Sequence, residues 1–144
     1  MDRALLEATI AKTANVPDSF NVHRKLVRLL DQRVQSSTGQ RDIDWATAEL
    51  AAMGTLAMQG HPVRLSGQDC GRGTFSQRHA VLHDIKTNEI YTPLQNLDPN
   101  QASVDVINSP LSEAGVLGFD YGYSLDAPDS LVMWEAQFLS LIHI

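Results

Sequence analysis

The sequence predicts an α/β fold in which a mostly parallel sheet is flanked by helices and preceded by further helices at the N-terminal end. Two observations lead to this prediction. Apolar residues recur at helical spacing through the first sixty residues, and short β-rich runs then alternate with one more helical segment. The order helix, strand, strand, helix, strand is typical of an α/β unit built around parallel strands.

Two helices are expected before residue 40. Leu5, Leu6 and Ile10 mark the first, and apolar residues recurring over 22–30 mark the second. Pro17, within "ANVPDSF", separates them because proline interrupts a helix. The segment "QSSTGQRD" that follows has the composition of a loop.

A third helix is predicted from about 45 to 59. Ala, Leu and Met recur at helical spacing in "DIDWATAELAAMGTLAMQG". Asp44 is expected to be the N-cap and Gly60 to end the helix.

The strands are expected after this helix. "HPVRLSGQD" alternates Val63 and Leu65 with polar neighbours, as a short strand does. "RHAVLHD" is predicted as a second strand, with "KTNE" as a turn and "IYTPL" as an extended piece beyond it. "SVDVI" at 103–107 is expected to be extended, and "DSLVMWEAQF" supplies a further β-rich run after the turn at Pro128.

Composition and charge exclude several classes of function. The chain has 144 residues, of which 43% are hydrophobic, enough to form one core. Its net charge of −6 provides no general positive potential that would attract nucleic acid. One cysteine, Cys70, gives neither an internal disulfide nor the Cys/His spacing of a zinc site. No segment approaches the roughly 20 apolar residues of a membrane span, and "MDRALLEATIAK" is not a secretory signal. We therefore expect a soluble intracellular protein with no metal site.

The loop "SGQDCGRGTFSQRHA" is the first candidate for a binding site. Ligands of open α/β sheets gather beyond the carboxyl ends of the strands, where this loop begins. Its glycines allow close approach of the backbone to a ligand, and Arg72, Arg78 and His79 are able to receive a carboxylate. The alternative is a polar connection whose glycines serve turns, with His79 as a structural residue.

Glu113 is the second candidate. Ser109 as cap and Pro110 as first residue are predicted to open a helix that reaches about residue 125, which places Glu113 in the first turn. A carboxylate there gains about 0.3–1 kcal/mol from the helix dipole. The same helix is apolar on most sides, so we expect it to be buried, and a buried glutamate needs a partner. The residues alone leave open whether Glu113 is structural or meets a ligand.

Four blocks of the sequence resemble a known enzyme family. They are "FNVHRKLVRLLDQR", "GHPVRLSGQDCGRGTFSQRHAVLHD", "YTPLQNL" and "SPLSEAGVLGFDYGYSLDAPDSLVMWEAQF". Over about residues 8–138 the chain is similar to the first, decarboxylating component of the 2-oxoglutarate dehydrogenase complex. "RLSGQD", "RGTFSQRHAV" and "WEAQF" are specific to this family and its 2-oxoadipate relative. The resemblance implies that the chain is a piece of a longer subunit.

The resemblance implies a domain organisation. We expect an N-terminal helical linker at 1–40, part of the pyrimidine-binding domain of a transketolase-like, thiamine-diphosphate-dependent enzyme at 41–138, and a divergent, truncated tail at 139–144. The family continues "WEAQF" with Gly-Asp-Phe, whereas this chain reads "LSLIHI". An aromatic residue that stacks on the pyrimidine is expected where this chain has Leu141, and "SEAG" replaces the family's more usual "SEEA".

The resemblance also implies roles for individual residues. Glu113 matches the glutamate that hydrogen-bonds a ring nitrogen of the cofactor's aminopyrimidine and favours its imino tautomer. His79 matches an active-site histidine associated with the substrate or with proton transfers. Phe119 and Gln137 are expected to line the pyrimidine pocket. The chain would hold only the pyrimidine half of thiamine diphosphate, and the magnesium ligands of the parent enzyme would lie outside it.

The function implied is decarboxylation of 2-oxoglutarate and transfer of succinyl to the lipoyl groups of the second component, within the tricarboxylic acid cycle. The implied partners are a second subunit in a homodimer and the lipoyl-bearing component, in bacterial cytoplasm or mitochondrial matrix, with no nucleic acid or membrane. We expect the chain alone to be inactive. Two alternatives remain at this point: a piece of a 2-oxoadipate dehydrogenase, and a non-catalytic assembly piece.

Overall fold

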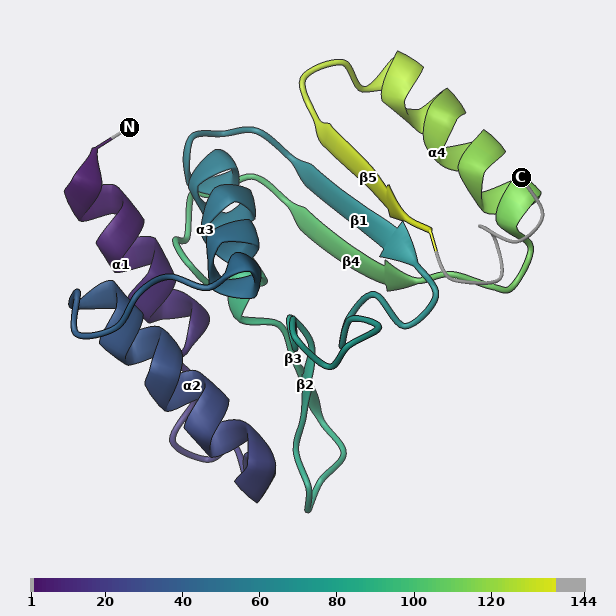
Figure 1. The fold of residues 1–144 in the computed structure, drawn as a ribbon. Helices are drawn as coiled ribbons and strands as arrows, with labels where there is room; N and C mark the ends of the chain where they lie inside the picture. Colours follow the sequence, from purple (N-terminus) through teal and green to yellow (C-terminus); the bar gives the residue numbers. More distant parts are fainter. Residues whose placement is uncertain (1, 137–144) are drawn as a thin grey trace.

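The computed structural model describes residues 2–136, and they form helices on both sides of a small sheet (Figure 1). The helices are α1 (Arg3–Thr13), α2 (Arg24–Ser37), α3 (Trp45–Met58), the short 3-10 helix η1 (Pro93–Gln95) and α4 (Glu113–Asp126). The strands are β1 (Val63–Gly67), β2 (Leu82–His83), β3 (Ile90–Tyr91), β4 (Val104–Asn108) and β5 (Leu131–Glu135).

The main sheet has the order β4-β1-β5, and both pairings are parallel. Val63 of β1 lies opposite Val104 of β4 on one side and Leu131 of β5 on the other. The connection from β4 to β5 runs through α4, as a parallel crossover requires. The predicted α/β class with a parallel sheet is confirmed.

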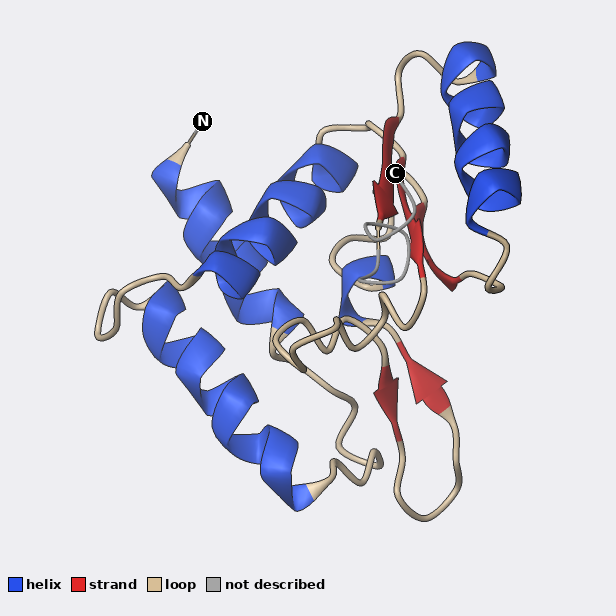
Figure 2. Ribbon diagram, turned by 45° about the vertical axis from the view of Figure 1, so that its right-hand side comes forward, coloured by secondary structure: helices blue, strands red, loops and turns tan. Residues whose placement is uncertain are grey.

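The two faces of β1 differ in chemistry, because successive side chains of a strand point to opposite faces. Val63 and Leu65 join the apolar core beneath α3. Arg64 and Ser66 bond instead to Asp120 of α4. Figure 2 shows the sheet standing between α4 and the N-terminal helices. The buried core cluster consists of Leu50, Met53, Ala57, Val63, Leu65, Cys70, Ala80, Leu94, Leu97 and Val104.

The three N-terminal helices pack side by side, with α1 against both α2 and α3. The predicted caps of α3 are confirmed: the Asp44 carboxylate accepts a hydrogen bond of 2.8 Å from the Thr47 N–H, and Gly60 has φ +90°. Gly54 allows α1 to approach closely, since a Cβ there would lie 2.6 Å from Cγ2 of Thr9.

The helix α2 ends later than the composition of "QSSTGQRD" predicted. It runs to Ser37, so the first residues of that stretch are helical. The Ser37 hydroxyl donates a hydrogen bond of 2.7 Å to the carbonyl oxygen of Val34. This bond gives the hydroxyl a partner, so that a serine is accommodated in the last turn of the helix.

The second predicted strand, "RHAVLHD", is mostly irregular. Only Leu82 and His83 are in strand conformation, and they pair antiparallel with Ile90 and Tyr91 in a separate two-stranded hairpin. "IYTPL" divides between β3 and η1 because Pro93 lacks the N–H that a ladder requires. Neither segment joins the main sheet.

Two expectations for the last helix are wrong. The helix α4 begins at Glu113 with Ser112 as N-cap, and not at Pro110, because the Ser109 N–H is held at 2.8 Å by the carbonyl oxygen of Gly67 at the sheet edge. It is also not buried: Asp120 is its one buried residue, and its apolar side chains Leu117, Tyr121 and Leu125 are exposed. Only one side of α4 contacts the sheet, and no described residue covers the other.

Candidate active site

The parallel strands bring three chain segments to one edge of the sheet. Gly67, Asn108 and Glu135 are the last residues of β1, β4 and β5, and Gly67 lies in register with both of the others. The loop 68–80 leaves this edge directly after β1, and α4 begins there. This edge is where an open α/β sheet binds its ligands, so both candidate segments from the sequence meet at the expected place.

Glu113 occupies the first position of α4, where the helix dipole favours its negative charge. Its side chain is half-buried, and the Gln68 amide donates to Oε1 over 3.4 Å, a long and therefore weak hydrogen bond. The contact joins the residue after β1 to the start of α4, and no local pattern in the sequence predicts it. Within residues 2–136, Oε2 accepts no hydrogen bond, so this carboxylate retains capacity for a ligand.

The loop 68–80 has an unusual backbone. Asp69, Ser76 and His79 have φ of +53°, +54° and +40°, the left-handed region that non-glycine residues seldom adopt. Such residues cost about 1–3 kcal/mol each when they are strained and occur preferentially at functional sites, where surrounding contacts hold them. The contacts that hold this loop centre on Arg78.

Arg78 is a buried ion-pair centre, 3% exposed. It donates to both carboxylate oxygens of Glu49 at 2.9 and 3.0 Å, to Glu135, and to the Cys70 carbonyl oxygen at 2.6 Å. Burial alone would lower the pKa of Arg78, but the Glu49 and Glu135 carboxylates outweigh it and raise that pKa. The bidentate geometry ties α3 and the end of β5 to the loop, directly before His79.

Glu135 and Cys70 lie beside Arg78. The second Glu135 oxygen, Oε1, is buried and has no hydrogen-bond partner among residues 2–136. Burial, followed by the Glu135 charge, raises the pKa of the Cys70 thiol to about 11, so this thiol stays protonated at neutral pH. Cys70 therefore acts as a core residue.

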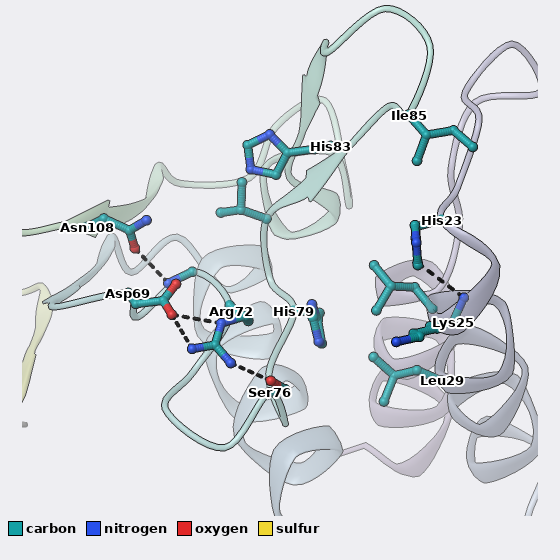
Figure 3. Close-up of a pocket in the computed structure, with 13 residues that line it drawn as sticks. His23, Lys25, Leu29, Asp69, Arg72, Ser76, His79, His83, Ile85 and Asn108 are labelled. Carbon is teal, nitrogen blue, oxygen red and sulfur yellow. Dashed lines mark hydrogen bonds and ion pairs between the residues drawn. The ribbon is translucent and has the colours of Figure 1, made fainter.

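His79 lines a cavity of about 700 Å³ between the loop and the start of α2. In Figure 3 its ring stands between Arg72 and Ser76 on one side and Lys25 and Leu29 on the other. Burial lowers the pKa of His79, and the guanidinium groups of Arg33 and Arg72 lower it further. The imidazole is therefore neutral at physiological pH and able to accept a proton.

Of the other two predicted site residues, only Phe119 lies within the part of the chain that the structure describes. Phe119 is 60% exposed and lines a different cavity, of about 360 Å³, beside α4. The guanidinium carbon of Arg64 lies 5.1 Å from the centre of its ring. Gln137, like Leu141, lies outside the described residues.

Sequence reasoning missed the pairing of Arg78 with Glu49 and Glu135. The partners are 29 and 57 residues away, on a helix and on a strand end, and no local pattern connects them. The sequence contains one weak signal for this pairing. In "RHAV" an arginine stands next to a short apolar run that enters the core, and a buried arginine requires carboxylate partners.

Two further features of residues 2–136 concern metal ions and membranes. No group of at least three His, Cys, Asp or Glu residues is placed to hold a metal ion there. In the same residues no helix has both the length and the apolar character that a membrane crossing requires.

The chain is similar in sequence to known proteins of one family. A family profile described as "Transketolase, pyrimidine binding domain" matches residues 41–144. The chain is 58% identical over 123 residues to a mitochondrial 2-oxoglutarate dehydrogenase of Schizosaccharomyces pombe, covering 85% of this chain and 12% of the relative. It is 56% identical over 127 residues to the 2-oxoglutarate dehydrogenase E1 component of Brucella ovis, covering 88% of this chain and 13% of the relative. The chain thus spans about an eighth of these relatives' length.

Proposed function

Because the chain belongs to the transketolase pyrimidine-binding-domain family, we propose that it is the pyrimidine-binding part of a 2-oxoglutarate dehydrogenase E1 component that uses thiamine diphosphate. The observation that supports this most directly is the position of Glu113. It sits at the carboxyl edge of the parallel sheet, at the start of a helix, with one weak partner.

The residues at this edge fit an aminopyrimidine ring. The Glu113 carboxylate has hydrogen-bonding capacity left, and a ring nitrogen is a suitable partner for it. Ser112 and Val116, on either side of Glu113 in the sequence, line a cavity whose wall also contains Ile107 and Phe119. Glu113 itself is not among the lining residues, but it directly follows Ser112, and a mainly apolar wall is a suitable surface for a flat heteroaromatic ring.

In this proposal the protein groups bind, orient and hold protons. Thiamine diphosphate, when bound, supplies the nucleophile that attacks the 2-oxo carbon and the electron sink for decarboxylation. Glu113 shares a proton with a ring nitrogen of the aminopyrimidine, and Gln68 orients its carboxylate. His79, neutral and facing the cavity of the 68–80 loop, accepts or returns a proton at the substrate.

The rest of the activity belongs to the longer subunit. We propose that the subunit decarboxylates 2-oxoglutarate and transfers succinyl to lipoyl groups of a second component, with a second subunit completing a homodimer. Its magnesium ligands lie outside this chain. Relatives occur in a mitochondrial and in a bacterial form, so the compartment is the mitochondrial matrix or the bacterial cytoplasm. The names of these relatives support 2-oxoglutarate over 2-oxoadipate as substrate.

The experiment that tests the proposal replaces Glu113 with Gln in a full-length subunit that carries this segment. We expect 2-oxoglutarate decarboxylation to fall by roughly a hundredfold or more, the scale of a lost acid–base group. Glu89→Gln is the matched control, because Glu89 is exposed in the hairpin and should leave turnover unchanged. Unchanged turnover in Glu113→Gln would mean that Glu113 only stabilises the start of α4.

A further inference from the structure

The side chain of Arg78, the residue before His79, is fixed by groups from three parts of the fold. It donates to both carboxylate oxygens of Glu49 in α3, at 2.9 and 3.0 Å, and to Glu135 at the end of β5. It also donates to the Cys70 carbonyl oxygen at 2.6 Å. A guanidinium bound to a carboxylate by two parallel hydrogen bonds is fixed in orientation as well as in distance.

The backbone on both sides of the Arg78–His79 peptide bond is held too. The N–H groups of Arg78 and His79 both donate to the carbonyl oxygen of Arg72, each at 3.0 Å. The carbonyl oxygen of Arg78 accepts a hydrogen bond from the buried Arg33 of α2. These contacts maintain His79 at φ +40°, a conformation that a residue other than glycine adopts only when its surroundings impose it.

The partners of Arg78 belong to the rigid part of the molecule. Glu49 directly precedes Leu50, which is 1% exposed in the core cluster beneath α3. The side chains of Glu49 and Glu135 are themselves only 24% and 20% exposed, so water competes little for their bonds to Arg78. The position of Arg78, and with it that of His79, therefore follows the position of α3 and the sheet.

The same contacts relate His79 to Glu113. Glu135 is the last residue of β5 and lies in register with Gly67, the last residue of β1. Gln68, the next residue along the chain, donates to the Glu113 carboxylate. The sheet edge thus carries Glu113 on one side, through Gln68, and holds the His79 segment on the other, through Glu135.

We propose that Arg78 and Glu49 are positioning residues, whose bidentate ion pair holds the imidazole of His79 at a fixed place relative to Glu113. The inference rests on the proposed function, in which His79 and Glu113 both handle protons. Arg78 and Glu49 are not among the residues that line the His79 cavity, so they act through His79 and not on the substrate. A misplacement of about 1 Å in an active site is able to lower a rate by roughly a hundredfold.

The first test replaces Glu49 with Gln in a full-length subunit that carries this segment. An amide has one acceptor oxygen, so it accepts only one of the two hydrogen bonds that Arg78 donates to Glu49. We expect kcat for 2-oxoglutarate decarboxylation to fall by roughly tenfold or more, with KM nearly unchanged, because the correct placement of His79 matters most in the transition state.

A second variant separates the geometry of the pair from its charge. Arg78→Lys keeps the positive charge but loses the planar fork, so kcat should fall to a similar extent. The double variant Glu49→Gln with Arg78→Lys should lose little more than either single variant, since both break the same contact. Wild-type kcat in Glu49→Gln and in Arg78→Lys would overturn the inference and leave the pair a purely structural role.

The control is a core substitution that destabilises the fold at a distance from this pair. Val104 is 2% exposed at the start of β4, the opposite end of that strand from the site edge. Val104→Ala removes buried apolar atoms and should lower the thermal midpoint, but leave kcat unchanged at temperatures where the subunit is folded. An equal fall of kcat in Val104→Ala would mean that general destabilisation causes the effect, and would also overturn the inference.

A further measurement follows His79 without turnover. Diethyl pyrocarbonate acylates accessible neutral imidazoles, and mass spectrometry of the digested protein measures this for each histidine. His79 is half-buried, whereas His61, between α3 and β1, is exposed and serves as internal reference. In Glu49→Gln and Arg78→Lys we expect His79 to react severalfold faster relative to His61, because the segment that holds it opens more often. An unchanged relative rate would contradict the positioning role.

The failure of this inference and the failure of the proposed function give different results. If Glu113→Gln abolishes turnover while Glu49→Gln and Arg78→Lys keep the wild-type kcat and His79 reactivity, the proposed function stands and the positioning role is wrong. If Glu113→Gln has no effect, the proposed function fails, and the reactivity of His79 still decides whether the ion pair holds it in place.

Discussion

Asp84 is a single carboxylate that joins two distant segments. It accepts hydrogen bonds from the Asn21 N–H at 2.6 Å and its side-chain amide at 3.0 Å, and from the N–H groups of Lys86 and Thr87 at 2.7 and 3.0 Å. These bonds fix the segment before α2 against the β2–β3 hairpin, and with it one wall of the His79 cavity. The hydrogen bond from the Asn21 N–H is the largest cause that holds the pKa of Asp84 well below its usual range.

This lowered pKa predicts a pH-dependent stability. A carboxylate whose pKa falls on folding stabilises the protein above its unfolded pKa, near 4, and loses this contribution as the pH falls through its folded pKa. Asp84→Asn should therefore lower the urea midpoint at neutral pH, and the difference from the wild type should narrow below about pH 4. Asp129→Asn, at an exposed turn, is the control. A difference that stays constant across this range would contradict the assignment.

Residues with local signals were predictable from the sequence, and residues with distant partners were not. Asp44 and Gly60 were assigned as caps because the helix geometry fixes which residue types belong there. Glu113 was placed in the first turn of its helix for the same reason, although that helix starts three residues later than predicted. The contacts of Asp84 and Arg78 escaped prediction, since Asn21 is 63 residues from Asp84 and Glu135 is 57 from Arg78.

At the scale of elements, α4 is fastened to the sheet by one polar cluster. Asp120 is 3% exposed and accepts hydrogen bonds from Arg64 Nε at 2.8 Å and from the Ser66 hydroxyl. The Arg64 guanidinium also lies 5.1 Å from the ring centres of both Phe119 and Tyr123. Glu113 is two helical turns from Asp120, so this cluster sets the position of Glu113 at the sheet edge.

Removing the carboxylate should loosen α4. Asp120→Ala leaves Arg64 and Ser66 without their partner, and we expect a loss of about 3 kcal/mol, the lower end of the range for breaking a buried ion pair. The double change Arg64→Met with Asp120→Leu should recover much of this. Urea unfolding measures both, with the exposed Asp126→Ala as control. The assignment is wrong if Asp120→Ala costs no more than the control.

The elements themselves were largely foreseen from periodicity, and their burial was not. Helical spacing predicted α1, α2 and α3, and alternation predicted β1. The expectation of a buried α4 failed because an apolar helix is buried only where something packs on it, and the sequence of one segment does not specify that. "RHAVLHD" was expected to be a strand of the sheet, but its backbone is bent by the left-handed His79.

For the molecule as a whole, the outer face of α4 is an exposed apolar surface near the site. Leu117, Tyr121 and Leu125 are all exposed on this helix. Contiguous apolar exposure of this kind marks a surface that contacts another protein segment or binds apolar probes. The isolated chain should therefore enhance the fluorescence of anilinonaphthalene sulfonate.

Substitution checks that α4 is the source of this signal. The double variant Leu117→Gln with Leu125→Gln should lower the dye fluorescence of the folded chain. Ile90→Gln, which removes a similarly exposed apolar residue from the hairpin, should lower it less. Equal decreases of dye fluorescence in the two variants would mean that the dye does not bind preferentially at α4.

The central position of β1 also has a consequence for synthesis on the ribosome. Its two neighbours are β4 and β5, and the last residue of β5 is made 68 residues after the last residue of β1. At a synthesis rate of about 5–20 residues per second, these residues take roughly 3–14 s to make. Throughout that time one edge of β1 has no partner strand. Nascent chains stalled between β4 and β5 should therefore be the ones that chaperones hold longest.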